Sequence, residues 1–426
     1  MSSVIAGDLP GLLEPLTPPV AIGSVGLGGY AGTICRLLEE QSHGDNPPVR
    51  LLAVYEPDVA THGDRLQALR AAGVQTPGSY EELLALPIEA VWLPVPIELH
   101  RPFTEQALAA GKTVMCEKPV VGSVDDLALL RAARDRAGLP LAVGFQDMYD
   151  PATHIVKQRL LAGALGTIQS ATLLACWPRG RKYFTRNAWA GRLRRNETWV
   201  LDSPLSNALS HYVNLLLFWL GATPAAPATP VSVAAELYRA NDIENFDTCS
   251  LRVQLAGGAT MLVLLTHACQ ETINPLITIT GDGGTLETVH QQHVTLRDRQ
   301  GQVSEEILLS TQLRPEMVRR FAGRVRGVLD DSAIATLEEA EAHLIVVNGT
   351  AEAAPVQPFP AGVVTTVSGR DGDTIRAVPG IEQVFTACAR QGQLPSESGL
   401  VAWSVPPGQR DLSGYHHFAG PARVGE

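Results

Sequence analysis

The sequence predicts an α/β protein with two domains: a doubly wound parallel sheet, then an α+β domain with a largely antiparallel open sheet. Three observations lead to this prediction. Residues 20–145 alternate between short apolar strands and helices, whereas residues 146–354 contain several strands in succession with glycine turns between them. At 426 residues, the chain is also longer than one ordinary hydrophobic core accommodates.

In the first domain, short connections between strands and helices predict parallel strands with helices on both faces. Strands are expected at 20–25, 49–55, 88–93, 113–116 and 141–143, and helices at 30–41, 59–72, 103–110 and 123–137. Residues 1–19 form a Pro-rich lead-in that lacks the pattern of a signal peptide.

The second domain is expected to span residues 146–354. Helices are predicted at 151–161, 205–220, 317–329 and 336–347, and strands at 168–176, 231–238, 249–255, 260–268, 276–280 and 284–289. The glycines at 257–258 and 281–284 indicate hairpin turns, so neighbouring strands should be antiparallel. Residues 355–426 are expected to form a linker and a C-terminal tail with one helix, 381–390.

Composition excludes several classes of function. The net charge of −11 disfavours nucleic-acid binding, because phosphate backbones are repelled. No run of about 18 apolar residues predicts a membrane span. Six scattered cysteines without a C-x-x-C pair indicate reduced thiols in a cytoplasmic protein, with no metal site and no disulfide framework.

A glycine-rich loop follows the first strand. Gly26, Gly28 and Ala31 fit the pattern G-x-G-x-x-[G/A] between a predicted strand and a predicted helix. Such a loop permits a tight turn and brings backbone amides of a helix N-terminus close to a pyrophosphate. The sequence therefore predicts a dinucleotide site. The loop residues expected to contact the cofactor are Gly26, Leu27, Gly28, Gly29 and Tyr30.

Glu56 ends the second predicted strand. An acidic side chain at this place accepts hydrogen bonds from the ribose hydroxyls of NAD and repels the 2′-phosphate of NADP. We therefore expect NAD as the cofactor, with NADP less favoured.

Further along, the chain resembles a known family. The motifs are a V-P-x-x-x-H turn (Val95, Pro96, His100), A-G-K before a strand, and the tripeptide Glu117-Lys118-Pro119. With the glycine loop, they resemble the Gfo/Idh/MocA family of sugar and cyclitol oxidoreductases over residues 20–350. The resemblance implies a Rossmann domain followed by an α/β domain with an open sheet. It also implies cofactor contacts by Val95, Pro96, His100, Glu117 and Lys118.

Lys118 is the first candidate catalytic residue. It ends a strand at the sheet edge where doubly wound proteins bind ligands, and partial burial there lowers a lysine pKa. An amine at that place can exchange the proton of a hydroxyl while hydride moves to the nicotinamide. Glu117 is expected to orient Lys118, and the resemblance suggests a cis peptide bond before Pro119.

The helix at 205–220 carries the second group of candidates. The family pattern is Asp-x-x-x-His-x-x-Asp, and the matching residues are Asn207, His211 and Asn214. On one helix face, Asn207 would bind substrate and His211 would relay a proton. Because both family aspartates are asparagines here, more proton chemistry falls to Lys118 and His211. Asp202 is a rival carboxylate outside the matched register, and Gln146 is a further substrate-binding candidate.

The loop 177–199 is basic within an acidic protein: seven of the seventeen residues 179–195 are Lys or Arg. Aromatic residues are interleaved, which suits a carbohydrate, and arginines suit a carboxylate or phosphate. Tyr183, Arg186 and Trp189 are the substrate candidates. A solvated loop or a subunit contact is an equal alternative.

We therefore expect an NAD-dependent oxidoreductase that acts on a secondary hydroxyl of a sugar, glycoside or cyclitol. One alternative is a glycoside-cleaving or epimerising enzyme that oxidises its substrate transiently. Another is a non-catalytic dinucleotide-binding regulatory protein. The open sheet and the resemblance also predict a homo-oligomer, a dimer or tetramer.

Overall fold

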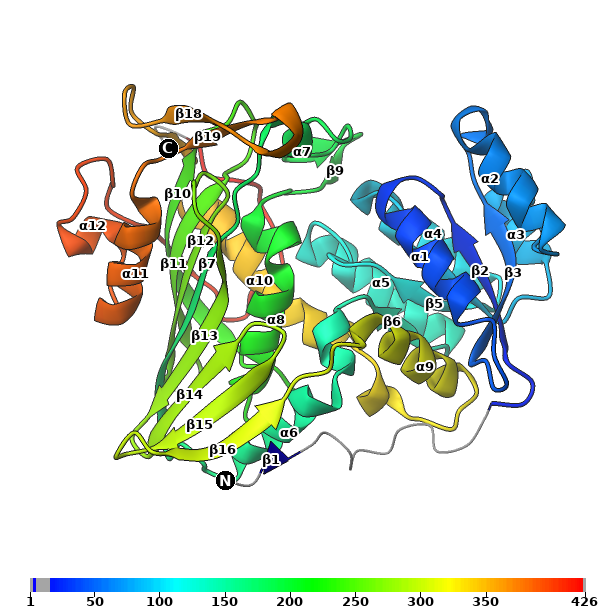
Figure 1. The fold of residues 1–426 in the computed structure, drawn as a ribbon, viewed down its shortest axis with the longest axis horizontal. Helices are drawn as coiled ribbons and strands as arrows, with labels where there is room; N and C mark the ends of the chain where they lie inside the picture. Colours follow the sequence, from blue (N-terminus) through cyan, green and yellow to red (C-terminus); the bar gives the residue numbers. More distant parts are fainter. Residues whose placement is uncertain (1–2, 5–15, 424–426) are drawn as a thin grey trace.

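The computed structural model describes residues 3–4 and 16–423, so most of the expected lead-in 1–19 lies outside the described residues. Two sheets face each other across a layer of helices (Figure 1). The smaller sheet has five strands and the larger has eleven. The predicted fold class, a parallel sheet followed by a mainly antiparallel one, is confirmed.

The smaller sheet is parallel throughout, in the order β3-β2-β4-β5-β6. Its strands are β2 (Val20–Val25), β3 (Val49–Tyr55), β4 (Ala90–Leu93), β5 (Thr113–Cys116) and β6 (Leu141–Val143). Its helices are α1 (Gly29–Glu40), α2 (Val59–Ala71), α3 (Tyr80–Ala85), α4 (Ile97–Ala109) and α5 (Val124–Ala137). The strand order reverses between β2 and β4, and ligands bind at such a point, beyond the carboxyl ends of the strands.

Helix α4 begins at Ile97, six residues before the predicted start at 103. Proline in a helix interior usually interrupts it, which is why the sequence predicted a later start. Here Pro102 lies inside the helix and Pro96 is its N-cap residue. The sequence suggested that His100 lies in a turn, but it lies on helix α4. The short helix α3 was not predicted.

The larger sheet follows the order β1-β16-β15-β14-β13-β7-β12-β11-β10-β17, with β20 paired to β10. Its longer strands are β7 (Ile168–Cys176), β10 (Pro230–Arg239), β11 (Thr248–Leu255), β12 (Thr260–Thr266), β13 (Ile273–Gly281), β14 (Gly284–Val289), β15 (His293–Asp298) and β16 (Val303–Leu308). Both predicted glycine turns join antiparallel neighbours, β11 to β12 and β13 to β14. β15 and β16 were not predicted. The short strand β1 (Ser3–Val4) pairs in parallel with β16.

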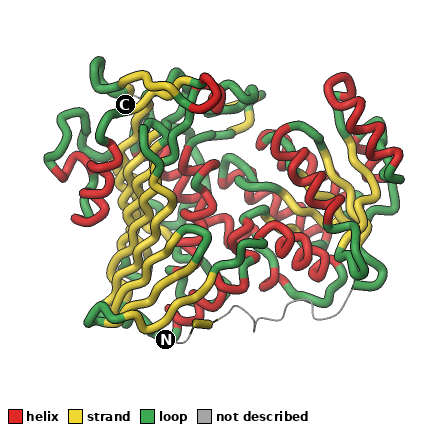
Figure 2. The backbone as a smooth tube through the Cα atoms, in the orientation of Figure 1, coloured by secondary structure: helices red, strands yellow, loops and turns green. Residues whose placement is uncertain are grey.

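Helices fill the space between the two sheets (Figure 2). They are α6 (Pro151–Leu161), α8 (Ser210–Trp219), α9 (Leu313–Val325) and α10 (Leu337–Ala353). Although α9 follows β16 of the larger sheet in the chain, it packs beside the smaller sheet. Its Phe321 meets Trp92 edge to face at 6.1 Å, and Arg326 pairs with Glu89. These contacts hold the two halves of the molecule together.

The C-terminal tail contains more structure than the single predicted helix. Helix α11 (Ile381–Gln391) lies on the outer face of the larger sheet, in the view of Figure 1 on its left side. Its Phe385 and Cys388 are fully buried with Leu262 and Leu264 of β12. The tail also forms α12 (Pro395–Ser398), β17 (Gln357–Pro358), β18 (Thr365–Ser368), β19 (Thr374–Ala377) and β20 (Gly408–Asp411).

Candidate active site

The glycine loop after β2 has the geometry that a pyrophosphate requires. Gly26 and Gly29 have φ of +88° and +50°, a region in which L side chains are strained. A Cβ on Gly32 would lie 2.4 Å from the Leu27 carbonyl oxygen, so only glycine lets α1 approach the loop this closely. No side chain caps α1, and Gly28, Gly29 and Tyr30 are exposed at its start. The free helix N-terminus fits a dinucleotide phosphate.

Glu56 follows β3 and lies beside this loop. Its carboxylate accepts hydrogen bonds from the backbone N–H of Leu27 at 2.5 Å and of Asp58 at 2.7 Å. A carboxylate has about four acceptor positions, so two remain for ribose hydroxyls. The negative charge beside the loop is unfavourable for the 2′-phosphate of NADP.

Lys118 extends from the end of β5 toward the second domain. Its Nζ donates to the backbone carbonyl of Asn207 at 2.8 Å and to Asn207 Oδ1 at 3.0 Å. Burial lowers the pKa of Lys118 to about 8, while the carboxylates of Glu117 and Asp202 oppose that shift. The amine therefore loses its proton at a lower pH than an ordinary lysine. The peptide bond to Pro119 is cis.

Glu117 was expected to orient Lys118, but the hydrogen bonds of the Lys118 amine go to Asn207. Glu117 Oε1 instead accepts a hydrogen bond from Trp92 Nε1 at 3.0 Å. Burial raises the pKa of Glu117 to about 7. The side chain that orients Lys118 is that of Asn207.

Asp202 supplies a carboxylate behind Asn207. Its Oδ1 accepts from Asn207 Nδ2 at 2.7 Å, which fixes the amide so that Asn207 Oδ1 faces Lys118. Its Oδ2 accepts from the Gly191 N–H at 2.7 Å and lies 3.7 Å from Arg186 Nη2. Asp202 is 3% exposed, and burial raises its pKa. A buried carboxylate thus acts on Lys118 through a neutral amide.

Asn207 and His211 lie in different helical segments and have different carboxylate partners. Pro204–Ala208 forms a π-helical segment, and α8 begins only at Ser210. His211 Nδ1 instead lies 3.3 Å from Asp147 Oδ2. Burial lowers the pKa of His211, and Asp147 opposes that change. His211 therefore has its own carboxylate partner.

The remaining candidates take different places. His100 ties together the ends of β4 and β5, since its ring nitrogens lie 2.9 Å from the carbonyl oxygens of Val95 and of Pro119. Pro96 caps α4. These residues shape the cofactor edge of the sheet. Among the described residues, the side chains of Gln146 and Asn214 make no hydrogen bond to Lys118 or His211.

The loop 177–199 stacks cations on aromatic rings. The Arg186 guanidinium lies 3.8 Å from the Tyr183 ring centroid and 4.8 Å from that of Trp189. Because Arg186 also reaches Asp202, the loop joins the network around Lys118. Arg195 contacts the smaller domain through an ion pair of 2.6 Å with Glu98. The structure thus brings Tyr183, Arg186 and Trp189 to one side of the site.

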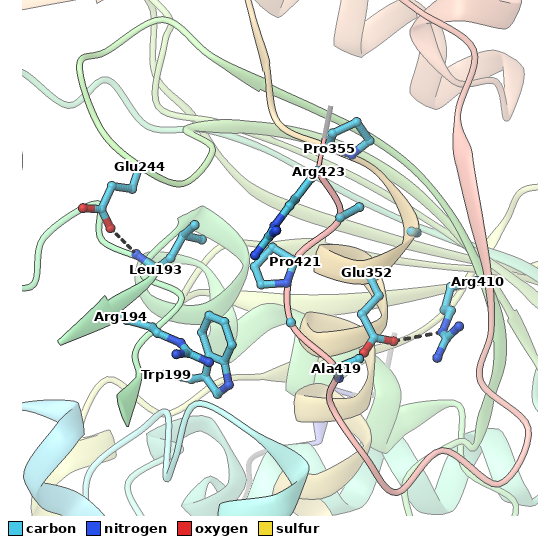
Figure 3. A pocket seen from close by; sticks show the side chains of 13 residues that line it. Leu193, Arg194, Trp199, Glu244, Glu352, Pro355, Arg410, Ala419, Pro421 and Arg423 are labelled. Atoms are coloured by element: carbon cyan, nitrogen blue, oxygen red, sulfur yellow. Dashed lines mark hydrogen bonds and ion pairs between the residues drawn. The ribbon is translucent and has the colours of Figure 1, made fainter. Parts of the chain in front are cut away.

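A separate hollow of about 870 Å³ lies between this loop and the end of the chain (Figure 3). Its carboxylates already have partners. Glu352 pairs with Arg410, and Glu244 accepts from the Leu193 N–H. None of the candidate site residues lines it, so it is not part of the active site.

Comparison with known proteins places these features in a family. A model described as the oxidoreductase family with an NAD-binding Rossmann fold matches residues 20–145. The model of the GFO/IDH/MocA C-terminal domain matches residues 153–287. The chain belongs to this family. Its first domain is accordingly an NAD-binding Rossmann domain.

Individual members of the family match over shorter stretches. Inositol 2-dehydrogenase from Rubrobacter xylanophilus is 32% identical over 148 residues, 34% of this chain and 41% of its own length. A dTDP-3,4-didehydro-2,6-dideoxy-α-D-glucose 3-reductase from Streptomyces violaceoruber is 42% identical over 84 residues, 20% of this chain and 24% of its own. The chain thus spans less than half the length of these relatives.

Solved structures show the same fold over a larger share of the chain. The WlbA dehydrogenase from Bordetella pertussis, in complex with NADH and UDP-GlcNAcA, superimposes with a TM-score of 0.63 at 22% identity. That match covers 78% of this chain and 95% of the other. An oxidoreductase from Thermotoga maritima gives a TM-score of 0.65 at 19% identity, over 78% and 95%.

Sequence reasoning missed Asp147 as a site residue and gave Asp202 only as a rival to Asn207. A signal for Asp147 existed, since it follows the end of β6 by a few residues, at the edge where ligands bind. Asp202 carried no such signal, because its role depends on the irregular turn that follows it.

Three further observations concern residues 16–423. No helix there is long and apolar enough to cross a membrane. No cluster of three or more His, Cys, Asp or Glu side chains is arranged to hold a metal ion. All six cysteines are free and buried.

Proposed function

We propose that this protein is an NAD-dependent oxidoreductase that transfers hydride between the nicotinamide and a secondary hydroxyl of a sugar, glycoside or cyclitol. The observation that carries the proposal is the Lys118 amine at the carboxyl edge of the parallel sheet, held by Asn207 and backed by Asp202. Two relatives are named for activity on inositol and on a deoxysugar, and these names support the proposed substrate class.

Each group has a defined task in this reaction. Bound NAD supplies the hydride acceptor or donor. In the oxidative direction, neutral Lys118 accepts the hydroxyl proton, and its pKa of about 8 makes that exchange possible near neutral pH. Asn207 holds the amine in place. Asp147 favours a proton on His211 Nδ1, which leaves Nε2 as an acceptor for a neighbouring substrate hydroxyl.

The variant Lys118→Ala tests the proposal. We expect it to bind NAD with nearly unchanged affinity in calorimetry and to lose about 10²–10⁴-fold in kcat, which is the usual contribution of a positioned acid or base. Unchanged turnover would contradict the assignment. In the wild type, stoichiometric build-up of NADH supports net oxidation, whereas turnover without NADH indicates transient oxidation.

We also propose that the chain forms a homo-oligomer in the cytoplasm. The buried free thiols support the location. Helix α11 covers one part of the larger sheet's outer face, but Leu276, Val289 and Leu308 on the same face are 40%, 41% and 46% exposed. A second copy that packs on them would bury this apolar surface. A monomer in light scattering at micromolar concentration would contradict the proposal.

A further inference from the structure

Arg179, in the loop 177–199, carries a charge with no carboxylate partner among residues 16–423. Its backbone N–H donates to the His267 carbonyl at 3.1 Å. Its guanidinium lies 5.4 Å from the Trp177 ring centroid and 5.0 Å from that of Tyr183. Its Nε is buried and makes no hydrogen bond. A buried N–H donor on a cation costs free energy unless a hydrogen-bond acceptor pairs with it.

Arg186 is the contrasting case in the same loop. It pairs with Asp202, donates to the Tyr183 carbonyl at 2.6 Å and is enclosed by two aromatic rings. Its charge and several of its donors are therefore already engaged. Of these two arginines, Arg179 is the one with donors left for a ligand.

The surroundings of Arg179 leave room for a ligand. It lines a hollow of about 940 Å³ together with Trp177, Lys182, Tyr183 and Arg370. Asp371 and Asp373 also line the hollow, and Asp373 Oδ1 accepts from the backbone N–H groups of Lys182 and Thr374. Volumes of this order are typical of sites for small molecules. Three cations, Arg179, Lys182 and Arg370, against these two carboxylates give the lining a net charge of +1.

His267 lies behind Arg179 and adds no positive charge. Its Nδ1 is 2.8 Å from the Trp177 carbonyl oxygen. Burial and the neighbouring Arg179 lower the pKa of His267 to about 3, so the ring is neutral at pH 7. The cation that faces the hollow from this side is Arg179 itself.

Two aromatic residues connect this hollow to the proton-transfer groups. Trp177 meets Tyr212, the neighbour of His211, edge to face at 6.1 Å. Tyr183 is contacted by Arg179 and by Arg186, which in turn reaches Asp202. These contacts link the wall of the hollow at Tyr183 to Arg186 and Asp202, next to the Asn207 that holds Lys118.

We propose that Arg179 binds an anionic substituent of the substrate, a carboxylate or a phosphate, so that the substrate is an acidic or phosphorylated carbohydrate. This inference rests on the proposed function. The planar guanidinium offers parallel N–H donors that match two oxygens of either group. The Trp177 and Tyr183 rings beside the guanidinium limit the access of water to the ion pair.

The test is a binding measurement that does not depend on turnover. The full chain, saturated with NADH, is titrated in a calorimeter with glucose, glucuronate and glucose 6-phosphate. We expect at least one of the two anionic sugars to bind about tenfold or more tightly than glucose, a difference of about 1.4 kcal/mol. The two anions separate a carboxylate site from a phosphate site.

Variants then assign the preference to Arg179. Arg179→Gln should remove it, Arg179→Lys should retain part of it, and the exposed control Arg181→Gln should leave it unchanged. In the wild type, added salt should weaken binding of the anionic sugar and not of glucose, a readout that needs no variant. The inference is overturned if neither anion binds more tightly than glucose, or if Arg179→Gln keeps the preference. The turnover of Lys118→Ala tests the proposed function, and the anion preference of Arg179→Gln tests this inference. Because one readout is a rate and the other is a binding ratio, either proposal can fail without the other.

Discussion

Replacing Asp202 with asparagine changes one oxygen for an NH₂ group at the centre of the network that holds Lys118. The two carboxylate oxygens each accept one hydrogen bond, from Asn207 Nδ2 and from the Gly191 N–H, both at 2.7 Å. Asparagine has a single acceptor oxygen. One of these two donors is therefore left without a partner in a buried place, and Arg186 loses its counter-charge.

The cost follows from those contacts. A buried donor without a partner costs about 1–3 kcal/mol, so the free energy of unfolding should fall by that amount. If the Asn207 amide turns, it presents N–H groups to Lys118 and displaces the amine. A displacement of about 1 Å costs about 10²-fold in rate, and we expect kcat to fall by that factor. Because Asp202 helps to raise the pKa of Lys118, the variant should also shift the pH dependence of activity toward acid.

The assay measures NADH formation between about pH 6 and pH 10, with the carbohydrate that gives the highest rate in a substrate screen. Urea unfolding of the same variants measures their stability. Asp331→Asn is a matched control, since Asp331 pairs with Arg324 at the protein surface. A merely structural role for Asp202 would lower stability without moving the pH profile. Wild-type kcat with an unchanged profile in Asp202→Asn would refute the positioning role.

Three other predictions concern the cofactor, acid stability and packing. Glu56→Gln should reduce the preference for NAD over NADP about tenfold in calorimetry, and an unchanged ratio would argue against its role in selectivity. Burial lowers the pKa of His343 from an ordinary 6.5 to about 4, so the unfolded chain binds this proton first and stability falls as pH drops through that window. His343→Gln should reduce this loss by up to about 3 kcal/mol in urea unfolding at pH 6.5 and pH 4, and equal losses would contradict the assignment. Gly144→Ala would place a Cβ 2.5 Å from Glu117 Oε2 and should cost about 1–3 kcal/mol in unfolding free energy, whereas Gly257→Ala, with no atom within 4 Å, should cost less.

The smaller domain follows closely from sequence because its signals are local. Apolar strands, a glycine loop and short connections predict a parallel sheet, and β5 was predicted with its observed bounds, Thr113–Cys116. The position of Lys118 at the sheet edge follows from the same pattern. The main error was the start of α4, where Pro102 breaks a local rule that the tertiary structure overrides.

The network around Lys118 was less predictable because it depends on irregular backbone and on long-range contacts. Asn207 and His211 were expected on one face of a regular helix, but Asn207 lies in a π-helical segment and His211 in α8, and each has a different carboxylate partner. The sequence indicated that two family aspartates are missing here. It did not indicate that Asp202 and Asp147 supply carboxylates from other positions.

The central claim is that Lys118 exchanges the proton of the substrate hydroxyl, and the pH dependence of kcat/KM tests it most directly. The wild type should show oxidation rates that rise with pH through an apparent pKa near 8, where Lys118 loses its proton. Lys118→Arg keeps the positive charge but cannot lose a proton in this range, so turnover and the rise with pH should both disappear. A Lys118→Arg variant that retains the wild-type rate and the same pH dependence would contradict the account.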